Sequence, residues 1–225
     1  MKLKSVITAR AIWLFDIQDL NPKGKSIFPD LFEWLKEQYH FGKFPKAIDD
    51  RDQHGGWAFS DGDFQVKEEI FIAADLAIYS DGLVATTHSS TSDTEAFMEN
   101  VLESACKDFS LVFDPQMVRR KMYLSEINVT AEGSLSVINP ALSEFARQIS
   151  SALSLDGAQE FQPVGISFGS DQTITPISKQ LFTGFSLERK IGAPFSENRY
   201  WSKAPLPTDQ HLSLLEEFER TLMKQ

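Results

Sequence analysis

Three stretches of the sequence carry residue types that could do chemistry, and the first is Gly-Ile-Ser-Phe-Gly at 165–169. It matches the G-x-S-x-G elbow of serine hydrolases, and Asp209 and His211 follow in the chain order of a triad. An elbow requires a strand that turns sharply into a helix. Here the flanking apolar residues alternate and no helical pattern follows. We therefore expect Ser167 to lie in an antiparallel strand whose glycines mark a bulge or a close backbone approach.

The second stretch is the acidic segment Asp-Asp-Arg-Asp-Gln-His-Gly-Gly at 49–56. Its carboxylates could bind a hard divalent cation, which prefers oxygen ligands in a closed geometry. The spacing is not that of an EF-hand, and Arg51 interrupts the cluster. We expect a solvated loop and predict neither a metal nor a cofactor. A metal-assisted or hydrolytic enzyme with dispersed catalytic residues remains the alternative to a non-enzymatic protein.

The third group is basic and lies in the second half of the chain. Strand alternation puts Arg119 and Lys121 on one face of a predicted strand, and Arg189 belongs to a later strand. Cations on an uncovered sheet face could bind a phosphate, a carboxylate or an acidic partner, including the acidic first half of another copy. The alternative is that their aliphatic stems cover apolar sheet surface while the charges pair with nearby glutamates.

The segment 194–207, Pro-Phe-Ser-Glu-Asn-Arg-Tyr-Trp-Ser-Lys-Ala-Pro-Leu-Pro, adds four candidate binding residues: Arg199, Tyr200, Trp201 and Lys203. Tyr, Trp and Arg dominate binding hot spots. The same stretch also reads as a connection, because its prolines stiffen the chain and its aromatic residues can anchor it to the core. We predict no catalytic residue; a partner or ligand would contact these four residues together with Arg119, Lys121 and Arg189.

Composition limits the classes of partner. The chain has 225 residues, 42% hydrophobic and 24% charged, as expected for a globular protein, with a net charge of −10. Residues 1–114 hold 11 Lys and Arg against 20 Asp and Glu, and residues 115–225 hold 11 against 12. An acidic surface repels nucleic acid and anionic lipid. We therefore expect no membrane association, and nucleic-acid binding only as an alternative that would use the less acidic second half.

Cysteine usage bears on the compartment. Cys106 is the only cysteine, so no intrachain disulfide can form. The basic and then apolar N-terminus is interrupted by Arg10 and Asp16 and has no small-residue cleavage site, which favours a strand over a signal peptide. These features predict a cytoplasmic location.

The elements that must position these residues follow from hydrophobic periodicity. In the first half, residues 5–18 alternate as a strand and Phe28, Leu31, Phe32, Leu35 and Tyr39 form a helical stripe. Two Ser-Asp-Gly sequences, at 60–62 and 80–82, predict tight hairpin turns between strands. A helix over 90–109 follows, with Ser92 and Glu95 as a predicted capping box.

The second half has the same pattern. A strand over 118–131 precedes a helix over 138–153, capped by Asn139, with an apolar stripe that we expect to be buried. The residues of that stripe are Leu142, Phe145, Ala146, Ile149, Ala152 and Leu153. Strands over 161–170 and 180–190 come next, and a helix that starts at Thr208 or Asp209 ends the chain.

This order predicts an α+β protein with two pseudo-equivalent β-α-β(n)-α halves, residues 1–114 and 115–225. We expect an antiparallel sheet whose helices pack on one face, which leaves the other face free for a partner. The element order resembles the duplicated helix-grip folds, of which the TATA-binding protein is an example; the resemblance implies an architecture and no function. The predicted function is a non-enzymatic binding or assembly module that associates with itself.

Overall fold

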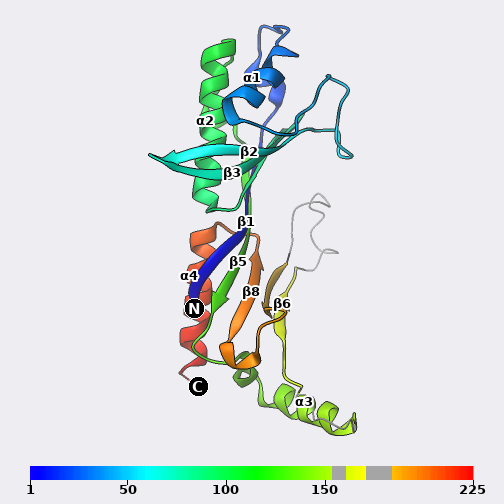
Figure 1. Cartoon of the computed structure of the whole chain (residues 1–225), viewed down its shortest axis with the longest axis vertical. Coiled ribbons are helices and arrows are strands. Elements are labelled where there is room, and N and C mark those ends of the chain that lie inside the picture. Colours follow the sequence, from blue (N-terminus) through cyan, green and yellow to red (C-terminus); the bar gives the residue numbers. More distant parts are fainter. Residues whose placement is uncertain (154–160, 171–183, 225) are drawn as a thin grey trace. The chain divides into compact units, whose positions relative to one another are not determined.

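The computed structural model describes residues 1–153, 161–170 and 184–224. Within them the chain forms an α+β fold with four α-helices and eight strands (Figure 1). The strands are β1 (Lys2–Leu14), β2 (Trp57–Lys67), β3 (Ile70–Tyr79), β4 (Gly82–Thr87), β5 (Arg120–Thr130), β6 (Gly165–Phe168), β7 (Phe185–Arg189) and β8 (Arg199–Ala204). The helices are α1 (Asp30–Tyr39), α2 (Thr91–Phe109), α3 (Pro140–Ala152) and α4 (Thr208–Leu222).

The described strands form one sheet in the order β2-β3-β4-β1-β5-β8-β7-β6, and the pairs β1–β4, β2–β3, β3–β4, β6–β7 and β7–β8 are antiparallel. The α+β class and the antiparallel sheet are therefore confirmed. The chain divides into two compact units. We call Val6–Ser125 with Leu206–Thr208 the N-terminal unit, and Met1–Ser5, Glu126–Pro205 and Asp209–Gln225 the C-terminal unit.

The N-terminal unit is organised around a core rich in aromatic residues. The predicted alternation of β1 is confirmed, since Ala9, Ala11 and Trp13 are buried while the residues between them are half-exposed. The stripe of α1 and that of α2 both pack against the same face of β1–β4, since they belong to one hydrophobic cluster with alternate strand residues. Phe32 shows the packing, because its ring centroid lies 5.6 Å from the ring centroid of Trp57 and 5.7 Å from that of Phe59.

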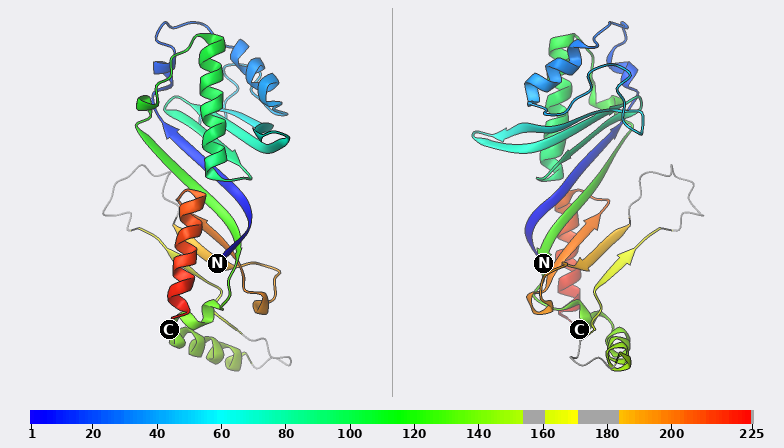
Figure 2. Two further views of the ribbon diagram at one scale, coloured as in Figure 1. Left: turned by 90° about the vertical axis from the view of Figure 1, so that its left-hand side faces the viewer. Right: turned by 45° about the vertical axis from the view of Figure 1, so that its right-hand side comes forward.

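In the C-terminal unit, α4 packs against the sheet and α3 does not. The helix α4 starts at Thr208, as predicted, and it buries Leu215 and His211. Both views of Figure 2 place α3 beyond the ends of the neighbouring strands rather than across their face. The predicted burial of the α3 stripe is wrong for Leu142, Phe145 and Leu153, which are exposed, while Ile149 is half-buried and Ala146 is buried.

Two local predictions need correction. The capping box of α2 is formed by Ser90 and Asp93, not by Ser92 and Glu95, because Ser90 is the last residue with extended backbone before the helix. The first Ser-Asp-Gly sequence does not make a hairpin turn. It lies inside β2 at a register shift, with Asp61 at φ 60°.

Glycine at position 62 is required by packing rather than by a turn. A Cβ atom there would lie 2.4 Å from the Phe41 ring. The second Ser-Asp-Gly sequence does connect β3 to β4, and Gly82, at φ 152°, lies so close to the backbone of Trp13 that a Cβ atom would overlap the Trp13 carbonyl. That turn is confirmed.

Candidate binding surface

The segment predicted as a connection contains a strand, because Arg199–Ala204 forms β8. The alternation of β8 separates the candidate residues. Tyr200 is fully buried with Ser202, whereas Arg199, Trp201 and Lys203 lie on the other face and remain at least partly accessible. The Tyr200 hydroxyl accepts a hydrogen bond of 3.1 Å from the Leu135 backbone N–H. Tyr200 is thus a core residue, and only the other three share an accessible face.

The cations on that face have carboxylate neighbours. Lys203 Nζ lies 3.2 Å from Glu126 Oε1, and Arg199 Nη1 lies 3.3 Å from Glu197 Oε2. Trp201 stands opposite Glu188 of β7 in the strand register. Acidic groups therefore accompany the basic ones, so this face is a mixed surface with an aromatic side chain at its centre and not a cationic strip.

Arg189 is a buried cation with a structural set of contacts. Its guanidinium donates to the Phe195 carbonyl at 2.9 Å, to Ser134 Oγ at 2.8 Å and to Gln162 Oε1 at 3.2 Å. It also lies 5.4 Å from the Tyr200 ring centroid. Arg189 therefore connects the segments that precede and follow α3, and the structure does not place it on the face that carries Trp201.

Lys121 lies on the helix-covered side of its strand, which corrects the expectation of a free face. Its ammonium group is 2.8 Å from Glu95 Oε1 of α2 and 4.0 Å from the Trp13 ring centroid. Tyr123 donates to the same Glu95 oxygen, and burial together with this contact raises the pKa of Tyr123 to about 12. Arg119 precedes the strand and donates its backbone N–H to the Leu14 carbonyl. The candidate cations thus do not converge.

Ser167 and His211, which a catalytic triad would bring together, have different hydrogen-bond partners in the structure. Ser167 lies in β6 and contacts Ser186 Oγ at 3.3 Å. His211 instead pairs with Ser202, at 2.8 Å between Nε2 and Oγ. Because Ser202 donates its only proton to the Ser186 carbonyl, the His211 Nε2–H donates to Ser202. Residues 171–183, where a helix after the elbow would be sought, lie outside the described residues.

Burial keeps the His211 imidazole neutral. Its side chain is inaccessible to solvent, and the loss of hydration lowers its pKa to about 4. His211 is therefore the neutral hydrogen-bonding group that its position in the first turn of α4 favours, because the positive end of a helix dipole disfavours imidazolium.

The acidic loop is held by its own hydrogen bonds. Although partial burial acts to raise the pKa of Asp52, hydrogen bonds from the backbone of Gly56 and His54 and from Tyr79 lower it below the usual value. Among the described residues, no group of three or more His, Cys, Asp or Glu side chains is placed to hold a metal ion.

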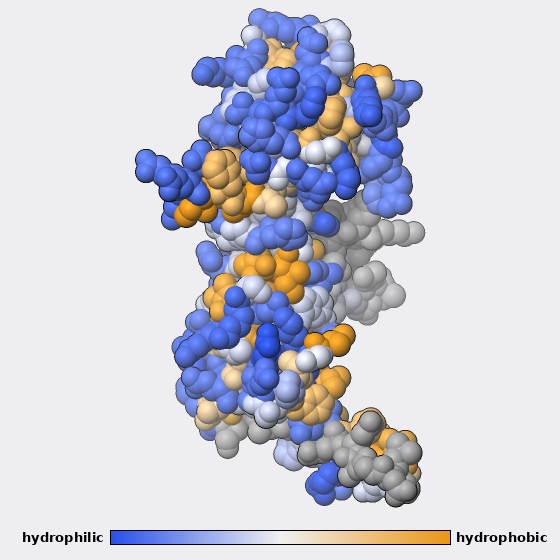
Figure 3. Space-filling model, in the orientation of Figure 1, coloured by the Kyte–Doolittle hydropathy of each residue, from blue (hydrophilic) through white to orange (hydrophobic). Residues whose placement is uncertain are grey.

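An apolar surface on α3 is the feature that sequence reasoning missed. Phe145 is 59% exposed and Leu142 48%. The Ser150 hydroxyl accepts a hydrogen bond of 2.9 Å from the Phe161 backbone N–H, which brings the following segment alongside the helix. We define the α3 surface as the exposed residues Leu142, Phe145, Leu153, Phe161 and Val164. Hydrophobic side chains are visible in this region next to α3 and β6 (Figure 3).

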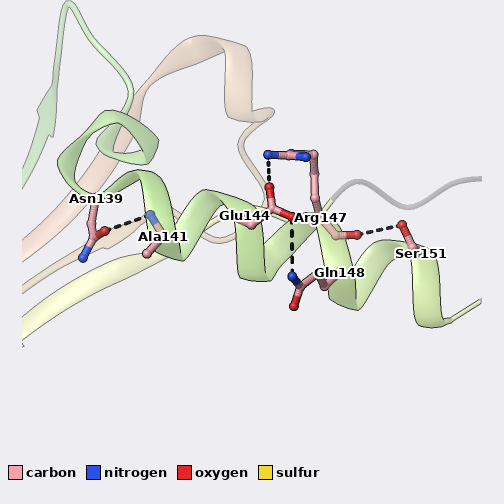
Figure 4. A network of polar contacts seen from close by, with 6 residues as sticks. All are labelled: Asn139, Ala141, Glu144, Arg147, Gln148 and Ser151. Atoms are coloured by element: carbon pink, nitrogen blue, oxygen red, sulfur yellow. Dashed lines mark hydrogen bonds and ion pairs between the residues drawn. The ribbon is translucent and has the colours of Figure 1, made fainter.

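The polar residues of α3 interact with one another. Asn139 caps the helix by accepting from the Ala141 N–H at 2.9 Å, and Glu144 pairs with Arg147 (Figure 4). Gln148 donates to the same glutamate at 3.4 Å. The helix is thus stabilised locally, while its side chains Leu142, Phe145 and Leu153 are exposed. The sequence signal was present as an amphipathic stripe, but its exposure could not be read from it.

Comparison with known proteins gives little further guidance. No family model matches the sequence, and no curated protein matches it. Among solved structures, Methanococcus jannaschii TBP is similar at 12% identity over 100% of both chains, with a TM-score of 0.43. A similarity of this extent supports no inference about function. In the described part of the chain, no helix has the combination of length and apolarity that spanning a bilayer requires.

Proposed function

We propose that this protein is a non-enzymatic binding and assembly module that associates with a second copy of itself through the α3 surface. The observation that carries the proposal is the exposure of large apolar side chains along one side of a capped, amphipathic helix. Contiguous exposed apolar residues on a soluble protein typically mark an interaction site, because their burial against a partner removes them from water.

The neighbouring strand supports a second copy as the partner. β6 is at the end of the strand order within the described residues, and its residue Phe168 is also exposed. A strand at a sheet edge presents unpaired backbone groups that can bind another strand. A second copy offers the same edge and the same apolar helix, and such self-complementarity is what a two-fold dimer requires.

The proposal includes an internal duplication, with residues 1–114 and 115–225 as equivalent halves. The element order supports it, because each half reads strand, helix, three strands, helix in the described chain. The strand order supports it as well. If β1 to β4 are matched to β5 to β8, the strand order of the sheet is the same from either end.

The outward face of β8 is proposed as a second contact region. Arg199, Trp201 and Lys203 share that face, while Glu126 and Glu188 supply charges of the opposite sign. Such a mixed surface suits the polar rim of a protein interface more than a phosphate backbone. The single cysteine, Cys106, is consistent with the reducing cytoplasm as the compartment.

The test is the oligomeric state, measured by light scattering coupled to size exclusion over a micromolar concentration series. We expect a dimer in the wild-type protein. Phe145→Ser should weaken its association about tenfold or more, because a central aromatic side chain carries much of the binding energy. Phe71→Ser is the matched control, since Phe71 in β3 is also 59% exposed but lies in the N-terminal unit.

Two outcomes would contradict the proposal. One is a wild-type protein that stays monomeric at high micromolar concentration. The other is equal weakening of the dimer by Phe145→Ser and Phe71→Ser, which would place the interface elsewhere.

A further inference from the structure

A cavity in the N-terminal unit suggests a ligand-binding site independent of the α3 surface. Its volume is about 300 Å³, at the lower end of the range for small-ligand pockets. Two of its walls are helices, which contribute Leu31 and Leu35 from α1 and Val101 and Ala105 from α2. The segment 17–28, parts of β2, β3 and β4, and the loop residues Arg51, Ser80 and Leu111 contribute the rest of the lining, which is predominantly apolar.

The walls of this cavity belong to the core of the unit. Leu35, Val101 and Leu102 are buried members of its hydrophobic cluster. Protein interiors are normally filled to the density of organic crystals, and unfilled apolar space lowers stability. Apolar cavities also bind apolar molecules that fit them. The cavity is therefore suited to the apolar part of a ligand.

Arg51 places a positive charge at the lining of the cavity. Its guanidinium carbon lies 4.2 Å from the Trp57 ring centroid, and Nη1 donates to the Gly55 carbonyl at 2.7 Å. Both Arg51 and Trp57 line the cavity. The stacking on Trp57 and the hydrogen bond to the loop fix the orientation of the guanidinium.

The carboxylates next to Arg51 in the sequence are used elsewhere. The Asp50 carboxylate accepts a hydrogen bond from the backbone N–H of Lys46. The Asp52 carboxylate accepts hydrogen bonds from the backbone N–H of Gly56 and the hydroxyl of Tyr79. In the part of the chain that the structure describes, no ion pair joins Arg51 to a carboxylate. A fixed cation at an apolar cavity without an ionic partner matches a ligand that carries one anionic group on an apolar body.

We propose that this cavity binds a small amphipathic carboxylate. Its hydrocarbon part occupies the space between α1 and α2, and its carboxylate group accepts hydrogen bonds from Arg51. The acidic loop that carries Arg51 then acts as the specificity element, since it holds the guanidinium at the cavity while Asp50 and Asp52 stay engaged in hydrogen bonds within the protein.

Isothermal titration calorimetry tests the charge preference with three straight-chain probes, each kept below its micellar concentration or its solubility limit. The probes are decanoate, decanol and decyltrimethylammonium, which share an apolar chain and differ in head-group charge. We expect decanoate to bind at least about tenfold more tightly than decanol, since a hydrogen bond between ions is worth at least one power of ten in affinity. Decyltrimethylammonium should bind most weakly.

Three variants locate the site. Arg51→Gln should reduce the affinity for decanoate about tenfold or more and leave decanol unchanged. Lys46→Gln is the matched control, because it removes a cation of the same loop that does not line the cavity. Ala105→Leu adds apolar volume to the cavity wall and should abolish decanoate binding while the melting temperature is kept or raised.

The proposal is overturned if decanoate does not bind, if the three probes bind equally, or if Ala105→Leu in a folded protein retains wild-type affinity. Equal losses in Arg51→Gln and Lys46→Gln would also overturn it, since they would indicate a general effect of loop charge. Each result is independent of the oligomeric state, so failure here leaves the dimer proposal standing, and the reverse holds as well.

Discussion

The helices α1 and α3 occupy the same place in the element order of the two halves, yet their apolar stripes have opposite environments. α1 buries Leu31, Phe32, Leu35 and Tyr39, whereas α3 leaves Leu142, Phe145 and Leu153 exposed. Both helices are amphipathic, and α3 has a side-chain N-cap that α1 lacks. The difference therefore does not originate in the helices themselves.

The neighbouring strands explain why the apolar stripe of α1 is buried and that of α3 is exposed. α1 packs on β2, an 11-residue strand that presents the buried aromatic residues Trp57 and Phe59. The strand that follows α3, β6, has only four residues in the described part of the chain, and its Phe168 is exposed. A helix stripe is buried only where another element offers a matching apolar surface. The comparison shows that an amphipathic pattern specifies which face is apolar, while its burial depends on the neighbour.

The largest expected effect comes from truncating one phenylalanine on each helix. Phe32→Ala removes a ring that is 2% exposed and contacts Trp57 and Phe59, and it should lower the free energy of unfolding by about 3–5 kcal/mol. Phe145→Ala should change it by less than about 0.5 kcal/mol when both are measured by urea denaturation at concentrations where the protein is monomeric. Comparable losses in the two variants would show that α3 is packed as closely as α1.

A second effect concerns α4, the helix of the C-terminal unit that does pack on the sheet. Since burial lowers the pKa of His211 to about 4 in the folded state, the unfolded chain binds its proton first, near pH 6.5. The stability that depends on neutral His211 is complete above pH 6.5 and is lost as the pH falls toward 4. The loss should reach about 3 kcal/mol.

Denaturation curves from pH 7 to 4 for the wild type and His211→Gln measure this loss. Glutamine does not titrate, so the difference in unfolding free energy between the two proteins should shift by about 3 kcal/mol across that range. A difference that stays constant with pH would mean that His211 is hydrated in the folded protein.

The smallest of the three effects tests how α3 is held without being buried. Arg189 bonds to Ser134 before the helix and to Gln162 after it. Arg189→Met should lower the free energy of unfolding by about 2 kcal/mol, because it leaves these groups without their donor. Arg199→Met is the control at an exposed arginine and should change it by less than about 0.5 kcal/mol. Similar losses of unfolding free energy in the two variants would contradict the anchoring role of Arg189.

The candidate binding residues were predictable in part. Period-two alternation correctly assigned the buried face of β1, and the same rule applied to β8 separates Tyr200 from Trp201. The prolines around 194–207 instead favour an irregular connection, which obscures this alternation. Alternation also cannot say which face of a strand a helix will cover, which is why Lys121 was expected on the free side and lies beside Glu95 of α2.

The sequence by itself determined the class and order of the elements, the antiparallel sheet, the start of α4 at Thr208 and the apolar face of each helix. These depend on local backbone preferences and on periodicity, both of which are properties of neighbouring residues. Tertiary structure alone decided that the α3 stripe is exposed, that Arg189 is buried, and that Arg51 stacks on Trp57 at the edge of a cavity. Those outcomes depend on contacts between residues far apart in the chain, and no local pattern encodes which surfaces will meet.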